Sequence, residues 1–202
     1  MQSIPYETTL IESDIVENLG NLRIDLVETS RIRVTDGADD WMLTTTPSFN
    51  QSNNGSPLYF GYTETPTIDL EAGFYEGTQS VTITNNEPNS VLRYTFDATN
   101  VKEDSPEYTG AFEVTENTVI KARSFSTDMQ ILPGKMDFIT LFIDENISLP
   151  VFSIAADGIQ LLANDRDDLI QTREFKPVGS LEYFDALGAV SYTHLRAHET
   201  RI

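Results

Sequence analysis

Few side chains in this chain could carry out covalent or metal chemistry. There is no cysteine, and the two histidines, His194 and His198, both lie among the last dozen residues. Residues 1–189 therefore cannot build a Ser/His/Asp triad, a Cys/His pair or a zinc site with histidine ligands. Carboxylates, hydroxyls and a few amines are the groups that remain for chemistry.

Two acidic clusters could bind calcium, an ion that prefers oxygen ligands. The first cluster comprises Asp36, Gly37, Asp39 and Asp40. Its spacing lacks the Asp/Asn pattern and the distal glutamate of an EF-hand loop, so a solvated turn is the alternative. The second cluster comprises Asn164, Asp165, Arg166, Asp167 and Asp168. The arginine in its middle favours a surface loop or a helix end over a metal site.

The single tryptophan suggests a different kind of site. Three further aromatic residues, Tyr59, Phe60 and Tyr62, lie about twenty residues after Trp41. Aromatic faces could stack on a sugar ring, because they offer flat apolar surface beside a polar edge. A lone tryptophan directly after a turn is more often a core residue than a platform, so the core is the assignment that we predict for Trp41.

Charge and composition exclude several classes of protein. Lys and Arg total 13 against 32 Asp and Glu, and the net charge of -19 would repel a phosphate backbone, so no nucleic-acid partner is expected. A hydrophobic fraction of 39% is enough to fill a core, which excludes wholesale disorder. The N-terminal residues show no signal peptide, and no run of 18 apolar residues predicts a membrane span.

The elements that must position these residues are strands. Turn residues and two-residue alternation dominate, no long amphipathic helix is visible, and the fold class is therefore all-β. Five short runs are separated by turn-rich pieces, with the spacing typical of a sandwich. They are Val81–Thr84, Val91–Phe96, Ala111–Val114, Thr118–Phe125 and Asp137–Ile143.

Alternation within these runs predicts a sheet with one buried and one solvated face. Leu92, Tyr94 and Phe96 share one side of their strand, as do Ile120 and Ala122 of another. The charged residues on the opposite side are Arg93, Lys121 and Arg123. We therefore expect an Ig-like antiparallel β-sandwich in the middle of the chain, flanked by partial β-rich segments.

Six short motifs in this region follow the order seen in one known family. They are Pro66-Thr67-Ile68, Gly73-Phe74-Tyr75, Val81-Thr82-Ile83, Arg93-Tyr94-Thr95, Tyr108-Thr109-Gly110 and Thr118-Val119-Ile120-Lys121-Ala122-Arg123. Residues 66–143 thereby resemble the chitobiase/β-hexosaminidase C-terminal domain, a small Ig-like accessory module. The sequence departs from the family's usual Thr-Asp-Gly-Ser turn, because it has Phe96-Asp97-Ala98-Thr99 there.

The flanks resemble two other modules. Residues 31–54 resemble the end of a lamin-tail-like domain, so we assign residues 1–56 to its C-terminal part and a linker. Three downstream segments, Leu149–Ile154, Arg173–Pro177 and Leu181–Asp185, resemble the opening strands of the CotH kinase family, so residues 148–189 are expected to begin such a domain. Between the first two segments, Asp157–Leu162 is predicted to form a short helix with Asp157 as its N-cap.

The last residues resemble the translation of a sequencing adaptor. Residues 190–201 read VSYTHLRAHETR, which resembles the peptide that such an adaptor gives when it is read as coding sequence. Residues 190–202 are therefore predicted to be an artefact, with Ser191–Ile202 foreign and unstructured. The alternative is a natural polar extension.

The CotH resemblance implies a parent protein that uses ATP and a divalent metal to phosphorylate secreted proteins. This chain has no G-x-G-x-x-G or G-x-x-x-x-G-K-[ST] loop, so no catalytic, cofactor-binding or metal-binding residue is assigned to it and no cofactor is expected in it. It is predicted to be a non-catalytic fragment of a large secreted bacterial CotH-type protein.

Two other functions remain open. The chain could be a carbohydrate-binding or adhesive accessory module of a carbohydrate-active extracellular protein, or a spacer with no ligand. The resemblances imply an extracellular or cell-surface location and contact with a surface protein or polysaccharide through the parent.

Overall fold

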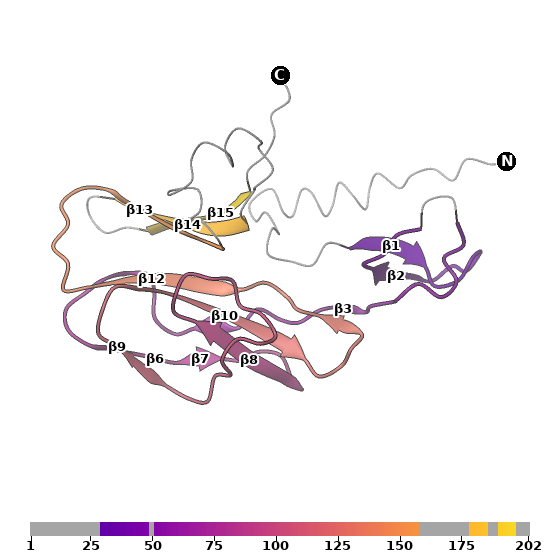
Figure 1. The fold of residues 1–202 in the computed structure, drawn as a ribbon, viewed down its shortest axis with the longest axis horizontal. Helices are drawn as coiled ribbons and strands as arrows, with labels where there is room; N and C mark the ends of the chain where they lie inside the picture. Colours follow the sequence, from indigo (N-terminus) through magenta and orange to yellow (C-terminus); the bar gives the residue numbers. More distant parts are fainter. Residues whose placement is uncertain (1–28, 49–50, 158–177, 186–189, 197–202) are drawn as a thin grey trace, which may run out of the picture.

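The computed structural model describes residues 29–48, 51–157, 178–185 and 190–196 (Figure 1). All regular structure in these residues is strand, which confirms the all-β class. None of the described residues forms a helix long and apolar enough to span a membrane. Most of the predicted helix Asp157–Leu162 and the whole acidic cluster at 164–168 fall outside the described residues, and Asp157 itself lies in a turn.

The central sandwich is built around a four-stranded sheet. Its strands, in spatial order, are β5 (Gly73–Tyr75), β12 (Asp137–Ile143), β10 (Thr118–Ser126) and β8 (Ser90–Thr95). Strand β10 is antiparallel to both of its neighbours, whereas β5 runs parallel to β12. The sheet is thus antiparallel except at this edge, where β5 and β12, far apart in the chain, come together in the same direction.

Short strand pairs form the layer facing one side of this sheet. They are β4 (Thr67–Ile68) with β7 (Ile83–Thr84), and β6 (Gln79–Val81) with β9 (Phe112–Val114). Alternate residues of the central strands, among them Ile120, Ala122 and Leu141, point into this core and are fully buried. Four of the five predicted runs are present as single strands whose ends shift by at most one residue, whereas the run Val81–Thr84 is divided between the end of β6 and β7.

Two smaller pairs precede or flank the sandwich. Strands β1 (Ser30–Arg33) and β2 (Trp41–Thr44) form an antiparallel hairpin, and β3 (Gly61–Tyr62) runs parallel to β11 (Ile131–Leu132). Gly134, just after β11, lies so close to Thr63 that a Cβ atom would sit 2.0 Å from the Thr63 carbonyl oxygen. Only glycine permits this approach of the two backbones.

A third layer covers the other side of the four-stranded sheet. It consists of β13 (Val151–Ala156), β14 (Val178–Phe184) and β15 (Val190–Arg196), which are antiparallel in that order. In Figure 1 this sheet lies over β12, on the side away from β6, β7 and β9. The Phe184 ring packs at 5.2 Å from Phe142 of β12 and 5.7 Å from Phe74 of β5.

The position of the third layer shows that two predictions were wrong. The face of Arg93, Lys121 and Arg123 was expected in water, but Lys121 is only 1% exposed because β13 lies over it. The arginine side chains bond to loop carbonyls, Arg93 to Ser105 at 2.6 Å and Arg123 to Gly134 at 2.8 Å. The residues from Ser191 were expected to be unstructured, but strand β15 pairs with β14 as far as Arg196. The foreign origin of this segment stays a prediction.

The outer face of the third layer is apolar. Phe152 and Ile154 of β13 are 62% and 50% exposed, and Leu181 and Tyr183 stand beside them on β14. The rings of Phe152 and Tyr183 lie 4.9 Å apart. The more polar residues of these strands, Ser153, Ser180 and Glu182, face inward, so the usual hydrophobic-in pattern is partly reversed.

The turn that departs from the family pattern has a strained residue. Ala98 adopts a φ of 64°, in the left-handed region that glycine occupies without cost. The Asp97 carboxylate holds this turn by accepting hydrogen bonds from the backbone N–H of Thr99, at 3.1 Å, and from its hydroxyl, at 2.5 Å. The bonds to Thr99, mainly that from the hydroxyl, lower the pKa of Asp97.

We predict that Ala98→Gly raises the free energy of unfolding by about 0.5–1 kcal/mol, because glycine relieves the left-handed strain by more than it costs in chain entropy. Urea unfolding followed by tryptophan fluorescence and circular dichroism measures the change. Ala111→Gly is the matched control, since Ala111 is exposed and its φ is not positive. The control should lower the stability; a loss of stability in both variants would contradict the interpretation of the turn.

Candidate functional site

The first acidic cluster does not form a metal site in the structure. The Asp36 carboxylate accepts a hydrogen bond from the Asn53 N–H at 2.9 Å, and Asp39 forms an ion pair with Arg33 at 3.7 Å. Hydrogen bonds from the Ser52 side chain and from the Asn53 backbone lower the pKa of Asp36. No group of three potential acidic, histidine or cysteine ligands gathers anywhere among the described residues. Asp36 instead joins two surface loops, whereas the Asp39 ion pair lies within the β1–β2 hairpin, where Gly37 at a φ of 82° supplies the turn.

The aromatic residues around Trp41 do not form one platform. Trp41 is 50% exposed, so its assignment to the core is wrong, and the Arg33 guanidinium lies 4.9 Å from the centre of its ring. Tyr59 lies opposite Leu43, which places it on the Trp41 side of the chain by alternation. Phe60, 68% exposed, therefore points to the other side. The arrangement leaves two separate exposed rings.

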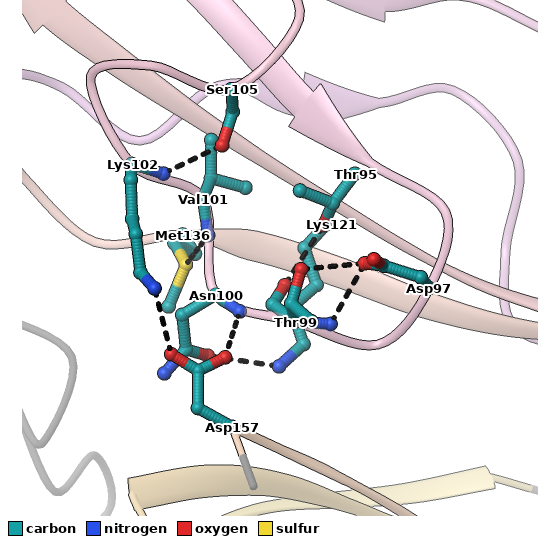
Figure 2. A network of polar contacts seen from close by, with 10 residues as sticks. All are labelled: Thr95, Asp97, Thr99, Asn100, Val101, Lys102, Ser105, Lys121, Met136 and Asp157. Carbon is teal, nitrogen blue, oxygen red and sulfur yellow. Dashed lines mark hydrogen bonds and ion pairs between the residues drawn. The ribbon is translucent and has the colours of Figure 1, made fainter.

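The described residues gather most of their buried polar groups at the junction between the four-stranded sheet and the third layer. At its centre, the Lys121 amine donates a hydrogen bond to Asn100 Oδ1 at 2.9 Å (Figure 2). It donates a second hydrogen bond to the Ala155 carbonyl of β13 at 3.2 Å. A buried amine without such partners would cost several kcal/mol. Lys121 therefore ties together β10, the loop after β8 and the strand that covers them.

The loop that supplies Asn100 is anchored by its neighbours. Val101 is fully buried in a small cluster with Phe125 and Met136, and its N–H donates to the Met136 sulphur at 3.4 Å. The Lys102 N–H donates to the Ser105 hydroxyl at 2.9 Å, which closes the turn that follows. Figure 2 shows these contacts on the part of the loop that follows Asn100. The amide of Asn100 is thus held by the packing of the loop.

Asp157, at the end of β13, fastens the third layer to this loop. Its Oδ1 accepts a hydrogen bond from the Asn100 N–H at 2.6 Å, and its Oδ2 lies 3.6 Å from the Lys102 amine. Sequence reasoning placed Asp157 at the start of a helix and assigned no role to Asn100. The pairing of a loop residue with another 57 positions later leaves no local pattern in the sequence.

A buried carboxylate lies further along the same junction. Glu182 of β14 is 1% exposed, and its Oε1 accepts no hydrogen bond. Burial raises the pKa of Glu182 to about 7, against hydrogen bonds from the side chain and backbone of Thr140, and the Asp137 charge adds to the rise. Thr140 also bonds to the Ser153 hydroxyl at 2.7 Å. Burial likewise raises the pKa of Asp137, despite hydrogen bonds from the Ile68 and Phe138 N–H groups.

Comparison with known proteins finds a known domain type in the middle of the chain. A chitobiase/beta-hexosaminidase C-terminal domain is found at residues 70–131. This is the core of the region that the sequence motifs suggested, and the sandwich there agrees with the Ig-like type. The chain is also 37% identical over 65 residues to an endoglucanase from Clostridium saccharobutylicum. That match covers 32% of this chain and 14% of the endoglucanase, and no solved structure matches significantly.

We predict that Glu182→Gln removes a pH dependence of stability. The carboxyl of Glu182 keeps its proton up to about pH 7 in the folded protein, whereas the unfolded chain releases it from about pH 4.5. The free energy of unfolding therefore falls as pH rises through this window, by about 3 kcal/mol at most. The variant should match the native protein near pH 4.5 and exceed it at pH 8.

Urea unfolding at several pH values measures this difference. Glu113→Gln, at an exposed glutamate of β9, is the control and should follow the native curve. Parallel curves for the native protein and Glu182→Gln would show that the carboxylate is not desolvated in the folded chain.

Proposed function

We propose that this chain is part of an extracellular carbohydrate-active protein in which the Ig-like domain is an accessory module that holds the following sheet in one orientation. The buried junction carries the proposal. It joins the two units through both aromatic packing and directional hydrogen bonds, from Phe184 at one end to Asp157 at the other. Hydrogen bonds with defined geometry restrict orientation in a way that apolar contact alone does not.

The carbohydrate-active context is supported by the domain at residues 70–131 and by the endoglucanase that resembles it. Because the chain covers only 14% of that endoglucanase, the activity of the whole protein is part of the proposal. The described residues support a structural role in it. The most desolvated carboxylate, Glu182, lies between packed sheets where a sugar cannot reach it, so it does not fit the paired carboxylates of glycoside hydrolysis.

A parent of the CotH kinase type is a second candidate. One observation favours it: strands β13 and β14 form over two of the segments that carry the resemblance, Leu149–Ile154 and Leu181–Asp185. The gene sequence beyond Gly188 separates the candidates. A sugar-cleaving or lectin domain would support the first, kinase-like Asp and Asn motifs would support the second, and further sandwiches would favour a plain spacer.

The orienting role predicts a narrow distribution of distances between the two units. The chain has no cysteine, so spin labels can be placed on Glu116→Cys and Leu149→Cys, two exposed positions on the sandwich and beside β13. Pulsed electron resonance should give one narrow peak. Phe184→Ala, which removes a fully buried ring worth about 3–5 kcal/mol, should broaden it.

Phe60→Ala is the matched control, since it truncates the same side chain at an exposed position away from the junction. Its distribution should equal that of the labelled native chain. A broad distribution in the native chain would contradict a fixed orientation and leave a flexible tether as the role of the domain.

A further inference from the structure

We propose that Lys121 and Asn100 become joined by an intramolecular isopeptide bond. The Lys121 amine lies 2.9 Å from the side-chain carbonyl oxygen of Asn100. Figure 2 shows Asn100, Lys121 and Asp157 converging from three separate segments of the chain. An amine, a carboxamide and a carboxylate that lie together are the groups needed to exchange one amide bond for another.

The reacting atoms are already close. A carbonyl bond is about 1.23 Å long, so Cγ of Asn100 lies within about 4 Å of the lysine Nζ. Attack needs a separation of about 3–3.5 Å with the amine aligned on the carbon, which a small rotation of either side chain supplies. The hydrogen bond from Nζ to the Ala155 carbonyl limits how far the amine can move away.

The surroundings favour the reaction in two ways. Attack requires the neutral amine, since only that form carries a free lone pair. Lys121 is 1% exposed, so bulk water is kept from its amine. Because both groups are held in the folded protein, the step is unimolecular and gains the large effective concentration of an oriented pair.

Asp157 is the proton carrier. Its Oδ1 accepts the Asn100 N–H at 2.6 Å, which holds the carboxylate against the residue that reacts. The lone pair of Nζ forms the new C–N bond to Cγ, and the carbonyl π pair moves to Oδ1. The carboxylate takes a proton from Nζ and passes it to Nδ2. The carbonyl then re-forms as the Cγ–Nδ2 bond breaks, and ammonia leaves.

The product would lock the loop after β8 to β10. One amide replaces another and one ammonia is released, so no oxidant or other reactant is needed. The bond closes a loop of about twenty residues, and a cross-link of this kind stabilises a protein by restricting its unfolded chain. It also fixes the loop to which Asp157 attaches the third layer.

Intact mass of the folded 202-residue chain tests the proposal. We expect a mass about 17 Da below that of the sequence, the mass of one ammonia, and a protease digest in which the Lys121 and Asn100 peptides are joined. Cyclisation at Gln2 or at Asn54-Gly55 would give the same loss, so the linked peptide and the variants below are needed to assign it.

Lys121→Arg and Asn100→Ser should both keep the full mass, because guanidinium is a poor nucleophile and serine has no carbonyl carbon. Asn100→Asp keeps that carbon and should lose about 18 Da as water. This variant should still form the cross-link, so it tests the proposal even if Lys121→Arg or Asn100→Ser does not fold. Lys102→Arg is the control and should lose ammonia like the native chain. Native protein that stays at full mass after prolonged incubation, or a loss of mass with no linked peptide of Lys121 and Asn100 in the digest, would overturn the proposal.

Discussion

Strand β10 is buried on both faces, and the rest of the structure depends on this constraint. Ile120 and Ala122 fill the sandwich core, while Lys121 points into the junction with the third layer. A lysine in that position must find hydrogen-bond partners, because an isolated buried amine is far too costly. Asn100 from a loop and the Ala155 carbonyl from β13 supply them. One side chain therefore couples the loop conformation to the docking of the following sheet.

Two kinds of contact hold the junction together, aromatic packing at one end and hydrogen bonds at the other. Phe74, Phe142 and Phe184 bury apolar surface, which attracts the two sheets without fixing an angle between them. Asp157 and Lys121 form hydrogen bonds of defined geometry at the other end. The aromatic contacts explain why the two sheets pack together, and the polar contacts explain why they pack in one orientation.

Local sequence predicted the strands of the sandwich well, because two-residue alternation reports a buried face directly. It failed for the opposite face: Lys121 has the same local pattern as a solvated lysine, and the layer that covers it begins with β13, 30 positions later in the chain. Trp41 was also misplaced, since a single aromatic residue after a turn carries no periodic signal. At Ala98 the sequence was informative, because the missing glycine of the turn motif marked the turn in which this residue adopts a positive φ.

The reversed polarity of the third layer affects how the protein behaves in solution. Its outer face presents Phe152, Ile154 and Tyr183 to water, and such a patch attracts other apolar surfaces. The net charge of -19 keeps molecules apart at low ionic strength. Salt at about 0.15 M shortens the range of this repulsion to roughly 8 Å. Colloidal stability should therefore fall as ionic strength rises, and purification at low salt suits this chain.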